Sequence, residues 1–367
     1  MIKRNILTVI TLLFVLLISA SCIRKSTDYS MQSVQYTFSG TGSGGHIQKQ
    51  LMDKLNVDAD INAPREIQNL DILLANSLKL NSQKVKELKE KFIDNSTIIK
   101  QTTTKNGEFL QTEDGKIFTL QNDNMLSLNT DRFIYINQLF NLTNQTNSTE
   151  DLYQKNLDLS FMSYTQAVKK VKEYLDFLNI SVNDDVEVYT LNNEAIQKKE
   201  EQFTNYKNSL SNQNINHIAQ VHLNSEDEGY FIIFRNSLDD FSIFSSEHGC
   251  IDTYTMVSGP LIYAYYSKNG LEYLFISHPY EKVSVDKKDL PVIGLEDALI
   301  TLKKKYENIV ITSPISITGI EFNYVPTLIN NSRNTFRMVP AWCFQFVQEN
   351  GTPSKMIIDA TNGREIL

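Results

Sequence analysis

Three segments of the chain place apolar residues at the spacing of an amphipathic helix. In residues 163–179 the apolar side chains recur three or four positions apart, lysines occupy the opposite side, and Ser163 with Gln166 matches a capping box. Residues 294–308 repeat this pattern, and residues 81–93 show a shorter version of it. Each segment is therefore predicted to be a helix with one face turned toward a core.

Between these helices, runs of alternating apolar and polar residues are separated by Asn-Gly or Asp-Gly pairs. Such a pair takes the positive φ angles of a type I′ turn and favours a β-hairpin. The pairs stand at residues 106–107, 114–115, 269–270, 350–351 and 362–363. Antiparallel strands are thus expected along the whole chain, and the predicted fold class is α+β.

One helix followed by antiparallel strands occurs three times, so we predict repeated units of one helix packed on a twisted antiparallel sheet. The predicted units are an N-terminal one at residues 51–140, an enlarged central one at 152–290 and a C-terminal one at 291–367. Residues 141–151 are rich in Asn and Thr and are predicted to be a linker. Their three Asn-x-Ser/Thr sequons would accept glycans in a eukaryotic secreted protein and are simply polar in a bacterial one.

The closing strand alternates in the same way. Between Thr335 and Val347 the even-numbered positions are mostly apolar, which predicts a half-buried strand. Because Pro340 has no N–H to donate, the strand is expected to be an edge or to be bulged there. Trp342, the only tryptophan, could be a ligand platform, but a lone Trp on an apolar strand face is more often a core residue, and we favour the core.

The N-terminal residues carry the pattern of an export signal. Lys3 and Arg4 precede the uncharged residues 6–20, and small residues stand just before Cys22. Crossing a bilayer takes about 20 apolar residues, so this stretch is short for a permanent anchor. We predict that residues 1–21 are a signal peptide. The mature protein is then expected to be a lipoprotein, with a plain secreted form or an uncleaved anchor as the alternatives to the lipoprotein.

The cysteine after this stretch resembles the lipobox of bacterial lipoproteins, in which the thiol is acylated. A lipobox usually carries Leu three positions before the cysteine, where this chain has Ser19. The resemblance implies that Cys22 is lipidated and that the lipid holds the protein to the outer face of a bacterial cell membrane. Residues 22–50 have few aliphatic side chains and are predicted to be a flexible tether.

The rest of the chain, about 320 residues, is long enough for two or three domains. The hydrophobic share of the full 367-residue chain is 41 %, with 17 Tyr and 19 Phe, and most of these residues lie in this part, where they can fill cores. The formal charge of −8 becomes −10 once residues 1–21 are removed, because they hold Lys3 and Arg4 and no acidic residue. An acidic surface without clustered Lys or Arg argues against nucleic acid as a partner and against electrostatic adhesion to anionic lipid.

Two cysteines remain after Cys22. An oxidising exterior permits Cys250 and Cys343 to form a disulfide. Two separate buried thiols are the alternative, because cysteine is among the most buried residue types. The spacing along the chain does not choose between the two.

No motif for catalysis, metal binding or phosphate binding stands out. His217 and His222 lack a ligand spacing, and His248 stands too close to Cys250 along the chain for a catalytic His–thiol pair. Acidic residues 226–228 are interpreted as a solvated turn rather than a Ca²⁺ loop, because the alternating oxygen ligands and the glycine of such a loop are missing. We predict no enzyme activity, no metal and no cofactor.

Aromatic residues are concentrated in several of the predicted strands. In residues 261–267, Tyr263 and Tyr265 could form a stacking surface for sugars or a peptide groove. Ordinary sheet cores use the same residues. Both interpretations stay open.

Residues 291–367 combine a helix beginning LEDAL, a strand carrying EFNYVP, and then VPAW and IIDATNGREIL. With Pro340 and Trp342 on one strand and Asp359 before a turn at Gly363, this stretch resembles the C-terminal module of the YycH/YycI regulatory proteins and of related Gram-positive lipoproteins, which have a PepSY-like helix-on-sheet build. The resemblance implies an extracytoplasmic, non-catalytic protein, which in the YycH/YycI case binds and modulates a sensor kinase. Those regulators keep a transmembrane helix where this chain has a lipobox, so the kinase partner is not carried over.

These observations together predict a membrane-anchored extracytoplasmic lipoprotein that acts by protein–protein binding, with an envelope protein or sensor as its partner. Docking at an edge strand or on a sheet surface is the expected mechanism. The alternative is a lipoprotein that captures a peptide or a cell-wall fragment. A flat exposed apolar patch would favour docking, and a concave aromatic pocket would favour capture.

Overall fold

The computed structural model of the chain describes residues 44–64, 67, 69–143, 154–209, 223–250, 255–329, 332, 334–348, 351 and 353–366, all within one compact unit. The side chains of residues 206–209, Cys250, Thr255 and Gln348 are outside this description. The predicted signal peptide, Cys22 and the tether up to residue 43 lie outside the described residues, and so does most of the predicted linker.

The described residues form a mixed α+β fold with mainly antiparallel sheets, which confirms the predicted fold class. The three predicted helices are present, and the Ser163–Gln166 capping box begins one of them. Two helices were not predicted, since one is short and the other is mostly polar, so neither shows a long apolar stripe. None of the described helices is both long and apolar enough to span a membrane. The helices are α2 (Ser82–Ile93), α3 (Asp131–Phe140), α4 (Tyr164–Phe177), α5 (Asn193–Ser209) and α6 (Leu295–Tyr306).

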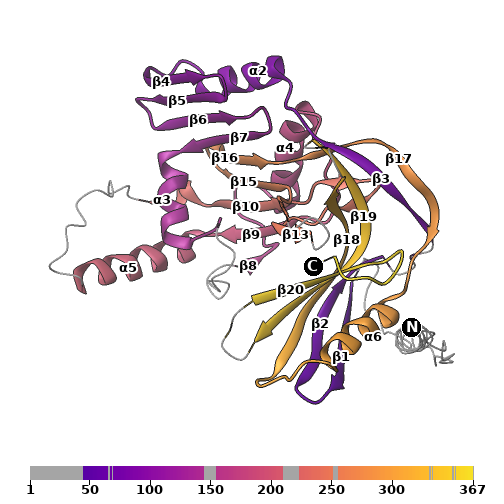
Figure 1. Cartoon of the computed structure of the whole chain (residues 1–367). Coiled ribbons are helices and arrows are strands. Elements are labelled where there is room, and N and C mark those ends of the chain that lie inside the picture. The colour runs from indigo at the N-terminus through magenta and orange to yellow at the C-terminus, as the bar shows by residue number, and fades with distance from the viewer. Residues whose placement is uncertain are drawn as a thin grey trace, which may run out of the picture. The chain divides into compact units, whose positions relative to one another are not determined.

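A nine-stranded antiparallel sheet forms the larger layer (Figure 1). Its first four strands make a meander that joins the others where β7 pairs with β16, so segments far apart in the sequence lie side by side. The strand order is β4 (Ile98–Thr104), β5 (Gly107–Thr112), β6 (Lys116–Gln121), β7 (Met125–Thr130), β16 (Gly270–Ser277), β15 (Leu261–Ser267), β10 (Gly229–Phe234), β9 (Glu187–Leu191) and β8 (Gln154–Lys155).

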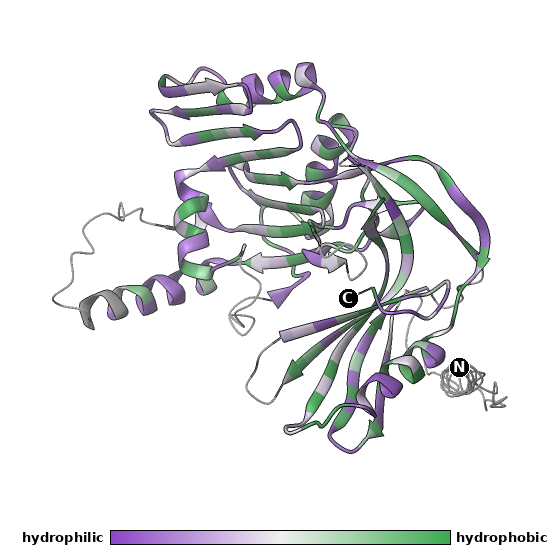
Figure 2. Cartoon of the chain, in the orientation of Figure 1, coloured by the Kyte–Doolittle hydropathy of each residue, from purple (hydrophilic) through white to green (hydrophobic). Residues whose placement is uncertain are grey.

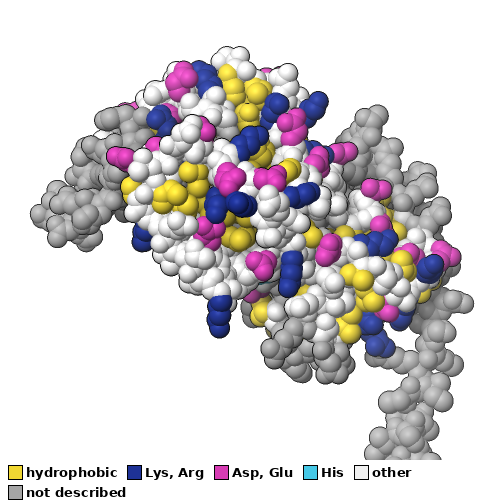
Figure 3. All heavy atoms as spheres, turned by 90° about the horizontal axis from the view of Figure 1, so that it is seen from above, with side chains coloured by type: hydrophobic (Ala, Val, Ile, Leu, Met, Phe, Trp, Pro, Cys, Tyr) yellow, Lys and Arg dark blue, Asp and Glu magenta, His cyan; other side chains and the backbone are white. Residues whose placement is uncertain are grey.

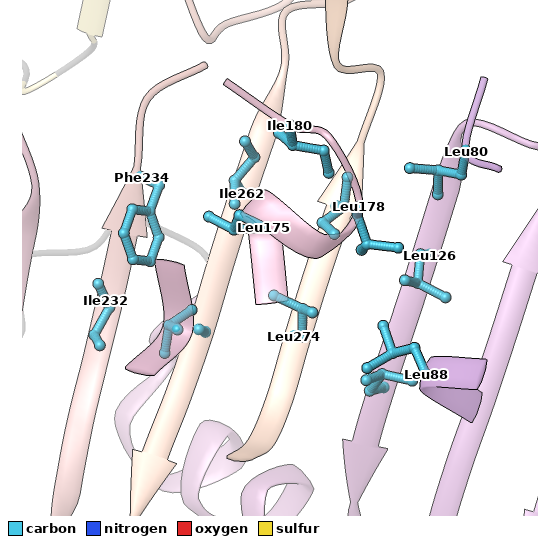
Figure 4. Packing of buried hydrophobic residues seen from close by; sticks show 14 of the residues in the cluster. Leu80, Leu88, Leu126, Leu175, Leu178, Ile180, Ile232, Phe234, Ile262 and Leu274 are labelled. Atoms are coloured by element: carbon cyan, nitrogen blue, oxygen red, sulfur yellow. The ribbon is translucent and has the colours of Figure 1, made fainter. Parts of the chain in front are cut away.

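Helices cover both faces of the nine-stranded sheet. On one face, Leu88 of α2 and Leu175 of α4 belong to the same core as Leu126 and Leu274 of the central strands (Figure 4). On the other face, α3 and α5 form a second core with the sheet, in which the ring of Phe133 stacks on that of Tyr273 at a centroid distance of 4.1 Å. The sheet is therefore the middle of three layers.

Strand β10 shows what this layering demands of the sequence. All six residues of β10 are buried, because its side chains face helices on both sides. Tyr230 and Ile232 lie in the core under α4, and Phe231 and Ile233 lie in the core under α3 and α5. The strand is thus buried on both faces, with its Phe and Ile residues among the hydrophobic positions coloured green in Figure 2, and it does not alternate.

The second large sheet has seven strands and carries α6 on one face (Figure 1). Helix α6 buries Leu299 and Leu302, and the indole N–H of Trp342 donates to the Ile293 carbonyl just before the helix at 3.0 Å. The pairing of β2 with β18 is parallel, and the other pairings are antiparallel. The order is β1 (Gly45–Met52), β2 (Leu55–Asn62), β18 (Ile315–Leu328), β19 (Thr335–Gln348), β3 (Asn69–Ser77) and β17 (Tyr280–Pro291), with β20 (Pro353–Asp359) also paired to β19.

Short elements between β10 and β15 connect the two layers. Ile243 forms a parallel bridge with Tyr324 of β18, and Phe244 packs with Val325 and Cys343 on the face of the seven-stranded sheet. The short elements are the pair β11 (Ser237–Leu238) with β12 (Phe241–Ser242) and the pair β13 (His248–Cys250) with β14 (Thr255–Val257). A 3₁₀ helix (Ser225–Asp227) precedes β10.

Strand β19 corrects the expectation for Pro340. The strand is not an edge, and its pairing with β18 runs through Pro340 without a bulge. On its other side, residues 335–338 pair with β3 and residues 341–347 pair with β20. Pro340 therefore lies where one neighbour ends and the next begins, so its missing N–H costs no ladder hydrogen bond on that side.

Three of the Asn-Gly and Asp-Gly pairs, at residues 106–107, 114–115 and 269–270, join paired strands, although the expected type I′ geometry is wrong for them. Pairs β4–β5, β5–β6 and β15–β16 each turn at one of them. Only the glycine has positive φ in these turns, for example +98° at Gly270, while the preceding Asn or Asp does not. The glycine alone thus supplies the left-handed conformation that the turn requires.

Strands of the three predicted α+β units are interleaved in the two sheets. The nine-stranded sheet combines strands from residues 51–140 with strands from residues 152–290. The seven-stranded sheet combines strands from all three ranges, because β17 pairs with β3 and β18 pairs with β2. The repeated helix-on-sheet unit is therefore not confirmed, although α2, α4 and α6 are each followed by antiparallel strands.

A buried ion pair connects the two sheets. Arg235, which follows β10, donates to Glu321 of β18 at 2.8 Å and to Glu187 of β9 at 3.2 Å. The side chains of Arg235 and Glu321 are each only 14 % exposed. Asn323 and Gln345 also donate to Glu321, at 2.8 Å and 3.1 Å, so the hydrogen-bonding capacity of its carboxylate is well used. We call Arg235, Glu321 and Glu187 the polar joint.

The charges of the polar joint stabilise one another. Burial alone would raise the pKa of Glu321, but the guanidinium of Arg235 holds that pKa below its ordinary value. Burial alone would lower the pKa of Arg235, but Glu321 and Glu187 raise it. Both groups are therefore ionised at neutral pH, and each depends on the other.

Replacing Arg235 is predicted to destabilise the protein. Arg235→Met leaves the Glu321 carboxylate buried without its counter-charge, which costs about 3–5 kcal/mol of unfolding free energy in urea titrations. The double variant Arg235→Met/Glu321→Leu should recover part of this loss, because neither charge is left alone. Lys170→Met, in an ion pair whose side chains are 50 % and 54 % exposed, is the control and should change stability by about 0.5 kcal/mol or less. A similar small loss for Arg235→Met would contradict the assigned role.

The polar joint also predicts a pH dependence. The pKa of Glu321 is lower in the folded protein than in the unfolded chain, so its contribution to stability is full above its ordinary pKa of 4.5 and is lost as the pH falls below it. The unfolding free energy should therefore fall more steeply below that pH in the wild type than in Arg235→Met. Urea titrations across the acidic range measure the two slopes, and equal slopes would contradict the prediction.

Candidate functional site

Strand β4 is an edge of the nine-stranded sheet with little to protect it. It pairs only with β5, and all seven of its residues are exposed. Ile98 and Ile99 are 47 % and 60 % exposed, and Lys100 is the only charged residue of the strand. The pairing with β5 has one irregularity, at Ile99. Unpaired backbone N–H and C=O groups on such an edge are a template for another strand.

The other edge strands carry devices that discourage pairing. Strand β17 has three register shifts against β3, six charged residues and Pro291 at its end. Residues Arg364 to Ile366 cover part of β20, since the Ile366 N–H donates to Ile357 at 2.8 Å. Strand β8 has two residues, and in β1 no aliphatic side chain is as exposed as Ile98 or Ile99 of β4. Against these four, β4 is the edge best suited to strand addition.

A shallow hollow of about 370 Å³ lies on the sheet face beside β4. Thr102 and Thr104 of β4 line it together with Phe109 of β5 and Thr119 of β6. Thr102 is aligned with Phe109, and Phe109 with Thr119, so these side chains share one face of the sheet. An added strand would place alternate side chains over this hollow, which is how such sites gain specificity.

A second candidate is the groove between α2 and α4. It consists of two hollows of about 500 Å³ and 510 Å³, both lined by Leu88, Lys91 and Tyr174. Phe177 and Tyr266 extend the aromatic lining of one hollow. The ammonium of Lys91 lies 5.2 Å from the centroid of the Tyr174 ring, and burial raises the pKa of Tyr174. The groove thus combines aromatic faces with a cation.

One end of this groove is formed by engaged charges. Arg132 donates to both carboxylate oxygens of the fully buried Asp227, at 2.5 Å and 2.7 Å, and these bonds raise the pKa of Arg132. Asp114 accepts from Thr112, and this bond, with further ones from neighbouring residues, lowers its pKa. The buried Glu272 accepts from Thr130 and two other side chains. These groups hold turns and helix ends in place.

Charges on the visible surface are mixed. In Figure 3, Lys and Arg side chains alternate with Asp and Glu across the face that is seen, with hydrophobic side chains between them. No single-sign field dominates that face, so neither candidate depends on long-range electrostatic attraction.

The residues of the predicted structural motif lie in the core and in a turn. Trp342 is 4 % exposed and packs edge-on against Phe322 at a centroid distance of 4.9 Å. Asp359 accepts from the backbone and hydroxyl of Thr361 at 2.8 Å and 2.7 Å, and the Gly363 N–H donates to the Asp359 carbonyl. Gly363 has a φ of +69°, as this tight turn requires. These residues shape the sheet rather than a site.

The acidic and aromatic candidates are also used by the fold. Glu226 pairs with Lys268 at 3.1 Å, and the Glu228 carboxylate accepts from a backbone N–H at the start of α5 at 2.8 Å. Tyr263 and Tyr265 are buried under α3 and α5, which leaves the sheet-core interpretation for both. Among the described residues, no group of three or more His, Cys, Asp or Glu side chains could hold a metal ion.

The histidine and cysteine candidates are not brought together in the described structure. His248 is 1 % exposed, and its ring nitrogens lie 3.1 Å and 2.8 Å from the carbonyls of Ser246 and Pro326. Cys343 is buried, and burial raises the pKa of its thiol. The side chain of Cys250 lies outside the described residues, as do His217 and His222, so a Cys250–Cys343 disulfide stays a prediction.

Sequence reasoning missed the polar joint and the β4 edge. Arg235 does leave a signal, since it ends the fully apolar run of β10, and a charge next to such a run calls for a buried partner. Glu321 leaves a similar signal within β18. The edge position of β4 leaves none, because it follows from which strands pair far along the chain.

Comparisons with known proteins bear on the fold alone. The chain matches no family model and no curated protein. Among solved structures it is similar to an uncharacterized protein from Eubacterium rectale ATCC 33656, with a TM-score of 0.64 and 15 % sequence identity over 88 % of this chain and 93 % of that chain. At this identity, the two proteins share a fold, and nothing about function follows from the likeness.

Burial of Cys343 predicts that it resists alkylation in the folded protein. Its raised pKa leaves little thiolate near pH 8, and a thiol 2 % exposed reacts only when the structure opens. Val310→Cys, at a position 89 % exposed, provides the matched reactive thiol and should be modified by iodoacetamide at least about tenfold faster. Peptide mapping measures both rates, and equal rates would contradict the prediction. An intact mass two hydrogens lighter without reductant would instead indicate the disulfide.

Proposed function

We propose that this protein is a membrane-anchored extracytoplasmic lipoprotein of a bacterial envelope, without enzyme activity, that binds a protein partner by strand addition at β4. The observation that carries the proposal is the exposure of the whole of β4 on a sheet whose other edge is short. Backbone hydrogen bonds to β4 would supply affinity, and the hollow lined by Thr102, Thr104 and Phe109 would supply specificity.

The anchor and the family resemblance belong to the same proposal. Lipidation of Cys22 would hold the chain at the outer face of the membrane, within reach of an envelope protein or sensor. The similarity of residues 291–367 to the YycH/YycI module supports a non-catalytic role. We also propose that the helix-on-sheet plan recurs in the chain, since α4 and α6 each precede antiparallel strands that they cover.

Site-specific photocrosslinking in the native envelope tests docking at β4. A benzophenone amino acid at Ile99 should form an adduct with a partner protein, because the added strand lies against this edge. The control places the same group at Val283 of β17, which is 54 % exposed against 60 % at Ile99. Adducts at Val283 in equal yield, or none at Ile99, would contradict the proposal.

A charge on the edge gives the second arm of that experiment. Gln101 carries the crosslinker, and Ile99→Lys is added to it, because an edge lysine opposes strand addition. The adduct yield should fall about tenfold, while the unfolding free energy changes by about 0.5 kcal/mol or less, since Ile99 is exposed. An unchanged yield would place the partner elsewhere.

The groove between α2 and α4 favours a second candidate function, the capture of a peptide or cell-wall fragment. Its aromatic and cationic lining suits stacking on a sugar and pairing with a carboxylate. A muropeptide at about 100 times its Kd should raise the unfolding free energy by about 2.7 kcal/mol. Tyr174→Ala should remove this gain, and Thr102→Ala, in β4, should keep it. No stabilisation by the muropeptide would remove this candidate.

A further inference from the structure

Exposed aliphatic side chains gather at one end of the seven-stranded sheet. Val310 is 89 % exposed and Ile309 is 49 % exposed, in the loop between α6 and β18. Val347, near the end of β19, is 38 % exposed, and Met52, at the end of β1, is partly exposed. We call these four residues the apolar tip.

Strand register places the members of the apolar tip at the same end of the sheet. Met52 is aligned with Leu55 at the start of β2, and Leu55 with Ile315 at the start of β18. Val347 is aligned with Ser316, the next residue of β18. The loop that carries Ile309 and Val310 enters β18 at this point, so all four residues flank the same strand ends.

Backbone contacts fix the loop of the apolar tip. The Ile315 N–H donates to the Lys54 carbonyl at 2.9 Å, and the Lys54 ammonium donates to the Thr312 carbonyl at 3.1 Å. The loop is thus tied to the β1–β2 turn. Single exposed aliphatic residues are ordinary on a protein surface, but two adjacent ones beside two more form a patch, which marks an interaction site.

Basic side chains flank the apolar tip. Lys303, Lys304 and Lys305 form the last turn of α6, directly before the loop. Lys305 pairs with Glu365, and Lys303 lies 3.8 Å from Glu307. Lys304 has no carboxylate partner among the described residues. Aliphatic residues at a tip with lysines behind them match the layering of a membrane interface, where long cationic side chains reach back to lipid headgroups.

The length of chain before the first described residue is compatible with this contact. Between Cys22 and Gly44 lie about 22 residues, which span at most about 75 Å when extended. Strand β1 runs from Gly45 to Met52, so the apolar tip lies eight residues from the start of the sheet, or about 26 Å. A lipid on Cys22 would therefore let the tip reach the same bilayer.

We propose that the apolar tip inserts Ile309 and Val310 into the outer surface of the membrane that holds the protein. The occupant is a lipid surface, because the patch is small and aliphatic and lies beside the lysines of α6, although Asp53 and Glu307 stand close to it along the chain. Transfer of apolar side chains supplies the attraction, so a net negative chain can still make this contact. This inference rests on the proposed membrane attachment, and it adds a second contact that fixes which end of the seven-stranded sheet faces the lipid.

Tryptophan quenching in vesicles tests the inference. The full-length chain, processed in a bacterial host, is reconstituted into vesicles of phosphatidylglycerol and phosphatidylethanolamine that contain lipids brominated along the acyl chain. Val310→Trp should show a blue-shifted emission and should lose at least about half of its intensity to the bromine atoms. The native Trp342 is buried and gives a constant background. Ile99→Trp, at an exposed position of the other sheet, is the matched control and should not be quenched.

The outcomes separate the inference from the proposed function. A chain that does not float with the vesicles contradicts the proposed attachment and with it this inference. A chain that floats while Val310→Trp is quenched no more than Ile99→Trp contradicts the inference alone. A blue shift that needs added envelope protein would assign the tip to a protein partner and would also overturn it. In a second pair of variants the reporter is Met52→Trp. Adding Val310→Asp to it should reduce the quenching of this tryptophan about tenfold, and an unchanged circular dichroism spectrum would show that the fold is kept.

Discussion

The ion pair between Arg235 and Glu321 is the constraint on which the arrangement of the two sheets depends. Burying two charges is costly. The cost is offset only if each carboxylate oxygen accepts a hydrogen bond and each guanidinium N–H donates one. Here Asn323 and Gln345 complete the set on one sheet and Glu187 completes it on the other. An apolar contact would tolerate sliding, whereas directional bonds to Glu321 specify one position of β18 against β10. The polar joint therefore favours specificity more than stability.

The sheets themselves are set by pairings that bring distant segments together. Strand β10 can be buried on both faces only because α4 covers one face and α3 with α5 covers the other. In β19, Pro340 falls between the partners β3 and β20, so the residue that cannot donate stands where neither neighbour needs a donor. A proline at a position of β19 that donates a backbone hydrogen bond to β3 or β20 would weaken the sheet. The position of Pro340 coincides with the change of partner along β19, from β3 up to Met338 to β20 from Ala341 onward.

A feature can be predicted from the sequence when residues close together along the chain determine it, and it is missed when it depends on segments far apart. The helices α2, α4 and α6, the capping box at Ser163 and the hairpin turns are local, and the sequence predicts them. The order of strands is not local, because β7–β16 and β2–β18 join segments whose only common property is an apolar face. The interleaving of the predicted units and the inner place of β19 were therefore missed. The candidate site at β4 was missed for the same reason, because a strand is an edge only when no other strand pairs with its second side, and this depends on the order of the strands.

The two exposed features have different physical requirements, which explains why they occur on different sheets. Strand addition at β4 needs open backbone groups, and it tolerates polar side chains such as the threonines of this strand. Contact with lipid needs aliphatic side chains, and it favours backbone groups that already have partners, such as the Ile315 N–H and the Thr312 carbonyl where the loop of the apolar tip bonds to the β1–β2 turn. When β4 binds a partner and the apolar tip binds lipid at the same time, a displacement of one sheet is transmitted to the other through the residue contacts between the two sheets. Among those contacts, the polar joint combines buried charges with several directional bonds, so it would resist such a displacement.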